Sequence, residues 1–194
     1  MDKTNTYPVA SPVWAKRDKI WFRCTSCREV HHGLPEISFE LPEAVAALSK
    51  GARRRRVLLD GDVAILDGTR YFFRATLSAP VIGCDHDVTW GVWVEAGWSA
   101  FKSYWQHLAA DGMGDVDELK PFKARLATTI AGLGTTRGLS GEISGSDDGA
   151  RPVFTLSATA KTVSHPLLKA QEAGVTQAFA LEQARKVGVL MLVT

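Results

Sequence analysis

The sequence VLLDGDVAILDGTRYFFRATLSAPVIGCDHDVTWGVWVE, residues 57–95, contains the pattern that decides the fold. Its apolar runs are rich in β-branched and aromatic side chains, which are typical of strands. The expected strands are 57–59, 62–66, 71–77 and 89–95. Asp60-Gly61 and Asp67-Gly68 favour tight hairpin turns between the first three runs. Because a parallel crossover needs about a dozen residues, these short turns predict an antiparallel β-meander.

Helical spacing and capping residues predict helices around this meander. The expected helices are 43–49, 100–110, 166–173 and 177–190, and a second strand pair is expected over 139–143 and 152–156. Segment 116–126 has weak helical character and is interrupted by Pro121. We expect Trp105 to pack against the meander with Phe101. Trp93 points to the other face of its strand and needs a second helix or a partner to cover it.

The residues before the meander predict a hairpin that carries a CxxC motif. Its expected strands are 19–24 and 37–41, with Cys24 at the end of the first strand and Cys27 in the connection between them. Residues 1–14 have no periodic pattern and are expected to form a flexible leader, followed by a single α+β domain over residues 15–194. The predicted fold class is therefore α+β, with an antiparallel β-meander packed against helices.

The composition is that of a globular protein. The chain has 194 residues, 45% of them hydrophobic, and 23 Lys+Arg against 21 Asp+Glu give a net charge of +2. A chain of this size buries roughly 70% of the surface of its unfolded form. The small net charge argues against a nucleic-acid partner, and no apolar stretch approaches the roughly 18 residues of a membrane span. We expect a cytoplasmic protein, in which an odd cysteine count favours metal binding or free thiols over disulfides.

Cys24 and Cys27 are the sharpest chemical feature of the sequence. A CxxC turn places two thiolates close enough to share a tetrahedral zinc ion, and His31 follows four residues later. Cys84 and His86 are candidates for a fourth ligand, because residues i and i+2 of an extended segment point the same way.

Other interpretations of the same residues stay open. The two cysteines can simply be partly buried thiols at the end of a strand. A metal-dependent hydrolase could use the same ligands with an open coordination position, taking carboxylates from Asp85, Asp87 or Glu95. A thioredoxin-type redox role is disfavoured, since Gly33 and Pro35 leave little room for the helix that such a motif needs.

The order of motifs along the chain resembles a bacterial family of uncharacterised proteins, the domain of unknown function 2199. The motifs that carry this resemblance are Cys24-x-x-Cys27, His31, Gly33-Leu34-Pro35, Tyr71-Phe72-Phe73-Arg74, Pro80-Val81, Trp90-Gly91-Val92-Trp93-Val94, Phe101-x-x-Tyr104 and His165-Pro166-Leu167. The resemblance covers about residues 20 to 190 and implies no assigned activity. Two features depart from it. Arg28 stands where the family usually has glycine, and the run Arg53–Arg56 belongs to no family pattern.

These observations favour a small cytosolic binding or interaction protein, in which any metal held at the CxxC/His motif, zinc being the candidate, stabilises the fold and does not react. Its protein partner is not identified by the sequence. The favoured interpretation of the arginine run is an extended, solvated edge strand that is protected from self-pairing. A further alternative is a regulatory protein that uses Trp93 and the arginine run as its contact surface.

Overall fold

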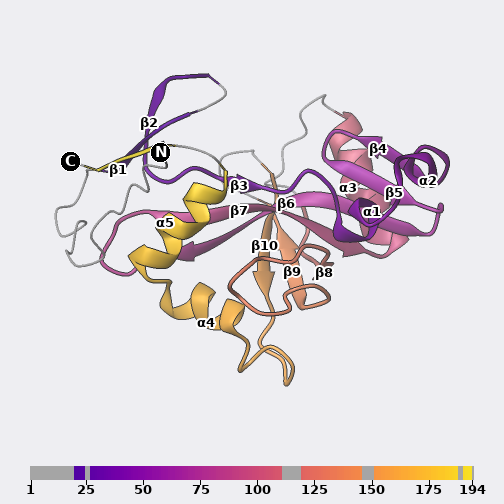
Figure 1. The fold of residues 1–194 in the computed structure, drawn as a ribbon. Coiled ribbons are helices and arrows are strands. Elements are labelled where there is room, and N and C mark those ends of the chain that lie inside the picture. The colour runs from indigo at the N-terminus through magenta and orange to yellow at the C-terminus, as the bar shows by residue number, and fades with distance from the viewer. Residues whose placement is uncertain (1–19, 25–26, 111–118, 146–150, 188–189, 194) are drawn as a thin grey trace.

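The computed structural model describes residues 20–24, 27–110, 119–145, 151–187 and 190–193. Its strands are β1 (Ile20–Arg23), β2 (Val30–His32), β3 (Ile37–Ser38), β4 (Val57–Asp60), β5 (Val63–Leu66), β6 (Arg70–Pro80), β7 (Asp87–Ala96), β8 (Phe122–Leu126), β9 (Ser140–Ser144), β10 (Val153–Leu156) and β11 (Leu190–Val193). Its helices are α1 (Glu43–Ala46), α2 (Lys50–Arg56), α3 (Trp98–Ala110), α4 (Pro166–Ala173) and α5 (Gln177–Lys186). The expected mixture of helices and strands is confirmed (Figure 1). The expected leader, residues 1–14, lies outside the described residues.

Strands β6 to β10 close into a barrel, which the sequence did not predict. Successive strands from β6 to β10 pair antiparallel, and β10 then pairs parallel with β6, with Val153 opposite Thr76. The Thr76 N–H donates to the Pro152 carbonyl at 2.8 Å across this seam. When an odd number of strands pair antiparallel in succession, the first and the last run in the same direction, so the pair that closes the barrel has to be parallel. In Figure 1, β8, β9 and β10 lie below the long ribbon of β6 and β7.

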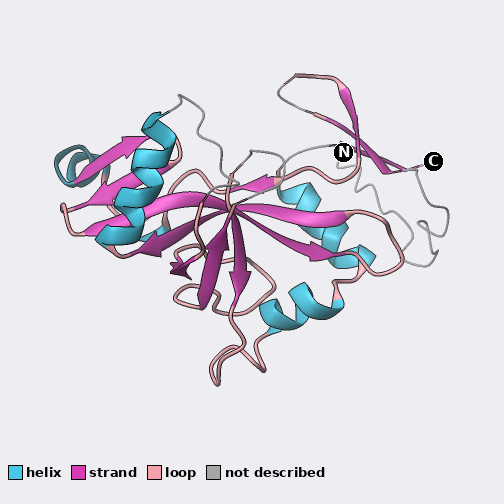
Figure 2. Ribbon diagram, turned by 180° about the vertical axis from the view of Figure 1, so that it is seen from behind, coloured by secondary structure: helices cyan, strands magenta, loops and turns pink. Residues whose placement is uncertain are grey.

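The hairpins expected between residues 57 and 95 are present. Strands β4, β5, β6 and β7 pair antiparallel in chain order, and the β6–β7 register runs from Tyr71 opposite Ala96 to Pro80 opposite Asp87. The expected architecture, a meander covered by helices, is corrected in one respect: β6 and β7 belong to the barrel, and β4 and β5 extend it on one side. Figure 2 shows α3 at one end of the β6–β7 ribbon and α4 and α5 at the other.

The main core fills the face of β6 and β7 on which Phe73 and Trp90 lie, both fully buried. Helix α3 adds Phe101 and Tyr104 to this core. The prediction for Trp105 is wrong, because this side chain is 37% exposed and Tyr104 takes the buried position on the helix.

Trp93 forms a second core on the opposite face of the sheet. Helix α1 supplies Val45 to this cluster and β6 supplies Phe72, and all three side chains are fully buried. The Trp93 Nε1–H donates to the Phe39 carbonyl at 2.9 Å, and the Arg74 guanidinium lies 5.1 Å from the centre of the indole ring. The expected orientation of Trp93 toward the opposite face is confirmed, and of the two covers considered, a helix or a partner, helix α1 is the one observed. A buried Trp93 is no contact surface for a partner.

The arginine run 53–56 lies in helix α2, so its interpretation as an extended edge strand is wrong. Ser49 caps this helix, since its side chain accepts from the Ala52 N–H at 3.3 Å. Arginine also has a favourable helix propensity, whereas the strand begins only at Val57, where β-branched and apolar residues take over.

The hairpin at the front of the chain has a different second strand from the expected one. Strand β1 pairs with β2, residues 30–32, and on its other side with β11, which the sequence did not predict. Strand β3, within the expected partner segment 37–41, instead pairs parallel with β7. In Figure 1 this three-stranded sheet stands at the upper left, above the end of the barrel sheet near α5.

Candidate metal centre

The β1–β2 hairpin positions the two cysteines. The Cys24 N–H donates to the Glu29 carbonyl at 2.9 Å, and the Arg28 N–H donates to the Cys24 carbonyl at 3.0 Å. These bonds tie the two ends of the turn together, with Cys24 directly after β1 and Cys27 inside the turn. The register places Phe22 opposite His31, so the imidazole comes from the neighbouring strand.

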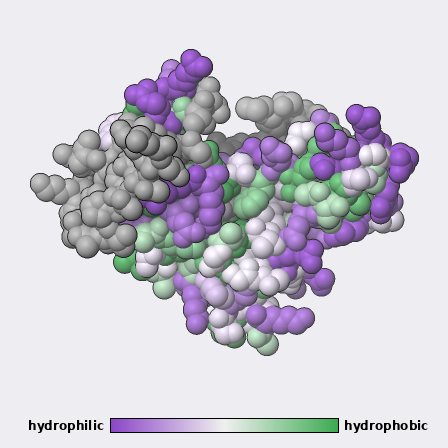
Figure 3. All heavy atoms as spheres, in the orientation of Figure 1, coloured by the Kyte–Doolittle hydropathy of each residue, from purple (hydrophilic) through white to green (hydrophobic). Residues whose placement is uncertain are grey.

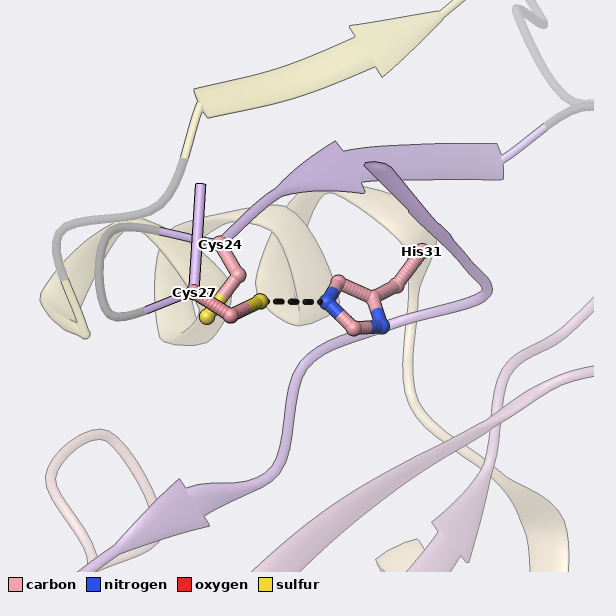
Figure 4. Close-up of side chains that lie close together, drawn as sticks. All are labelled: Cys24, Cys27 and His31. Carbon is pink, nitrogen blue, oxygen red and sulfur yellow. Dashed lines mark hydrogen bonds between the residues drawn. The ribbon is translucent and has the colours of Figure 1, made fainter. Parts of the chain in front are cut away.

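Cys24, Cys27 and His31 bring their ligand atoms to within 4.8 Å of one another. The Cys27 Sγ lies 3.0 Å from the His31 Nε2, and Figure 4 shows the three side chains pointing toward one another. Zinc–sulfur and zinc–nitrogen bond lengths put neighbouring ligand atoms of a tetrahedral site roughly 3.5–3.8 Å apart. The distances between the ligand atoms in the structure, 3.0 Å for Cys27 Sγ to His31 Nε2 and at most 4.8 Å for any pair, lie on either side of this tetrahedral spacing. Small side-chain rotations would therefore bring all three atoms to one ion.

The surroundings of the cluster orient His31, and they leave the whole cluster near the surface. The His31 ring stacks on Phe22, with 5.2 Å between ring centroids and 21° between planes, which directs Nε2 toward the thiols. Cys27 is exposed, whereas Cys24 and His31 are half-buried. Figure 3 shows hydrophilic residues over the hairpin. A metal ion has ready access to such a site.

Arg28 adopts the tight geometry that the family resemblance assigns to glycine. Its φ is 65°, in the left-handed region, where an L side chain costs roughly 1–2 kcal/mol. The Arg28 carbonyl accepts from Arg23 Nη1 at 3.1 Å, a bond that does not need the Arg28 side chain. The turn after the second cysteine thus has its expected shape despite the substitution.

For a turn that folds as it binds a metal ion at this cluster, Arg28→Gly is therefore expected to tighten metal binding. Removing the left-handed strain, less the extra freedom of glycine in the unfolded chain, leaves a gain of about 1 kcal/mol, or roughly fivefold in zinc affinity. Competition with a chromogenic chelator measures this change. Arg28→Ala is the control, because it removes the charge and keeps the strain. Equal affinities for the glycine and alanine variants would contradict the explanation by backbone strain.

Cys84 and His86 lie outside this cluster within the described part of the chain. They belong to the connection between β6 and β7, where the Cys84 N–H donates to the Val81 carbonyl at 3.0 Å. Burial raises the pKa of the Cys84 thiol, which disfavours the thiolate that a metal requires. His86 instead meets His32, the neighbour of His31 on β2, with 4.7 Å between ring centroids. The structure does not bring the two candidate fourth ligands to the three others.

Two of the carboxylates considered for a hydrolase, Asp87 and Glu95, lie far apart. Asp87 begins β7 and Glu95 lies near its end, and eight residues of strand span about 26 Å. Glu95 is bound by Arg70 through two hydrogen bonds of 2.7 Å. These positions supply no paired acid and base.

The structure reveals a polar cluster that sequence reasoning missed. Arg151 donates to Asp62 at 2.8 Å and to Glu36 at 2.9 Å, and Arg74 lies 3.4 Å from Asp62. Its members are far apart in the sequence, so no local spacing indicates it. The Glu36 carboxylate also covers Gly91, where a Cβ would collide with it. This network bridges β3 to the barrel.

Fold and site together define a class: a mixed α and β protein with a closed five-stranded barrel and a Cys₂His hairpin beside it. The chain belongs to the bacterial family described as uncharacterised protein conserved in bacteria, domain of unknown function 2199, which matches residues 23–175. The match includes all three residues of the cluster. No curated protein and no solved structure matches the chain. None of the helices in the described ranges is both long and apolar enough to span a membrane.

Proposed function

We propose that the protein is a small cytoplasmic binding or interaction protein, a single domain over residues 15–194, in which Cys24, Cys27 and His31 hold a structural zinc ion. The observation that carries the metal proposal is the convergence of the three ligand atoms within 4.8 Å. Two thiolates and an imidazole form a ligand set that suits zinc, whereas magnesium and calcium prefer oxygen ligands. None of the cysteines, all within the described residues, forms a disulfide, in keeping with a reducing compartment.

The hairpin also has a reason to need a metal. Its strands contain four and three residues, and Trp21 and Val30 remain 38% and 44% exposed. Although β11 adds a third strand, a sheet of such short strands is marginal in water without substantial burial of apolar surface. A structural zinc ion supplies folding energy to such a segment, as it does in small zinc-binding domains.

Elemental analysis tests the zinc proposal. The full chain is purified without a histidine tag, given excess zinc, desalted and measured together with Cys24→Ser and Cys84→Ser. We expect stoichiometric zinc in the original chain and in Cys84→Ser, and loss of zinc in Cys24→Ser. A chain that leaves the column without zinc, or a Cys24→Ser variant that retains it, would contradict the proposal.

The number of ligands keeps a metal-dependent hydrolase as a second candidate. Three protein ligands leave one tetrahedral position for water or substrate, as in catalytic zinc sites. The cobalt-substituted protein separates the two functions, because cobalt absorption changes when an added anion such as cyanide enters an open position. A spectrum unchanged by the anion supports the structural role, and a saturable change supports the hydrolase.

A further inference from the structure

We propose that strand β4, together with the exposed aromatic residues beside it, binds an acidic segment of another protein, which adds to the sheet as an extended strand. The proposal rests on the interaction role proposed above and names its surface and the chemistry of its partner. It does not require the zinc ion.

A row of apolar side chains crosses the sheet from β4 to helix α3. The register places Leu58 opposite Ile65 and Ile65 opposite Tyr71, so the three side chains share one face in adjacent strands. The Tyr71 ring lies 5.0 Å from that of Trp98, at the start of α3. Leu58 and Trp98 are each 54% exposed, and Trp105, two turns along the helix, is 37% exposed. Exposed tryptophans next to aliphatic side chains are typical of binding hot spots.

Strand β4 offers a backbone edge next to this row. It is the last strand of the eight-stranded sheet, so within the described ranges only β5 pairs with it. Leu58 and Leu59 point to opposite faces, yet both are more than half exposed, at 54% and 51%. An edge strand with apolar side chains on both faces and free backbone groups is a template for strand addition.

The charge beside the edge indicates the partner. Helix α2 runs directly into β4 and carries arginine at all of positions 53–56. Asp67 binds Arg56 through hydrogen bonds of 2.8 and 2.6 Å. Arg54 and Arg55 are exposed, and no acidic group among the described residues pairs with either. An acidic segment would neutralise them, whereas a second copy of this chain would add a second arginine run to the same interface.

Synthetic peptides test the proposal on the full chain. One pool of ten-residue peptides alternates Glu with Val, Ile or Tyr; a second replaces Glu by Lys; a third has the composition of the first without alternation. Fluorescence anisotropy should show saturable binding of the first pool alone, weakened by salt. Hydrogen exchange of the β4 amides should slow when the peptide binds.

Variants locate the binding surface. Arg54→Glu/Arg55→Glu and Leu58→Asp should each weaken binding by roughly tenfold or more. Lys120→Glu/Lys123→Glu, which changes the net charge equally at exposed positions away from α2, should bind normally, as should zinc-free Cys24→Ser. If Leu58→Asp fails to fold, Leu58→Ser replaces it.

The alternatives have distinct outcomes. Absence of binding by the alternating acidic pool overturns the proposal, as does equal binding by the pool without alternation, which would show attraction by charge alone. Self-association in sedimentation that Leu58→Asp abolishes would assign the edge to a second copy and also overturn it. Loss of peptide binding in Cys24→Ser would overturn the assignment of the binding surface to β4 without the zinc hairpin.

Discussion

Gly141→Ala should lower the free energy of unfolding by about 2–3 kcal/mol, because β9 has no room for a side chain at this position. A Cβ at Gly141 would collide with the Thr155 carbonyl oxygen and lie 2.6 Å from Cε2 of Phe154. The carbonyl belongs to β10, which pairs with β9, and the Phe154 ring is fully buried. Neither group can move without disturbing the barrel wall. For a chain of this length the melting temperature should fall by roughly 5–10 °C.

Gly97→Ala is the matched control for this prediction. Gly97 lies between β7 and α3, and a Cβ there would meet nothing within 4 Å. It should melt close to the original chain, or slightly higher, since alanine reduces the freedom of the unfolded chain. Equal melting temperatures for the two variants would show that β9 and β10 do not approach as closely as the structure has them.

The strands from β4 to β7 could be predicted because their signal is local. Apolar runs broken by Asp-Gly pairs fix both the strands and their antiparallel neighbours. The starts of the last two helices were equally predictable. His165 accepts from the Leu167 N–H at 3.1 Å and Thr176 from the Phe179 N–H at 3.2 Å, so each caps its helix directly before the predicted first residue. The predicted end of the last helix at residue 190 is wrong, because α5 ends at Lys186 and β11 begins at Leu190.

The barrel could not be predicted because its closure joins distant residues. Thr76 meets Val153 across the seam, and no pattern near either residue indicates this pairing. Strand β8 did carry a signal: Phe122, Ala124 and Leu126 alternate with lysine and arginine at the period of a strand. The segment was instead predicted to be a weak helix interrupted by Pro121, whereas a proline just before a strand is well tolerated.

The candidate metal ligands were only partly predictable, for a related reason. The CxxC spacing and His31 lie in one hairpin, so local sequence brings them together. Cys84 and His86 are near each other in the sequence, but the direction of their connection depends on the barrel and the hairpin together. His86 contacts His32, which alternates with His31 along β2 and therefore points to the other side of the strand. A fourth ligand thus could not be inferred from spacing.

Cys27→Ser should lower zinc affinity by more than about a hundredfold, because a hydroxyl is a far weaker ligand for zinc than a thiolate. The structural consequence should be local. Trp21, Phe22 and Val30 lie outside both buried clusters, so the hairpin shares little apolar contact with the barrel core. Hydrogen exchange at the amides of β1 and β2 should therefore become roughly a hundredfold faster without zinc, while β6 and β7 keep their protection.

The contact between His32 and His86 is where a loss of protection in β1 and β2 could extend to the barrel. It joins β2 to the connection between the barrel strands β6 and β7. His86→Ala removes that contact and keeps all three ligands, so it should bind zinc with unchanged affinity. In Cys84→Ser, zinc is removed with a chelator, and hydrogen exchange is measured as for Cys27→Ser. This variant controls for the loss of a thiol that is not a candidate ligand. Unchanged exchange in β1 and β2 after zinc removal would contradict a structural role for the ion.

Faster exchange in β6 and β7 as well as in β1 and β2 would show that the ion stabilises the barrel. If the histidine pair transmits that effect, zinc removal from His86→Ala should leave the exchange of β6 and β7 unchanged.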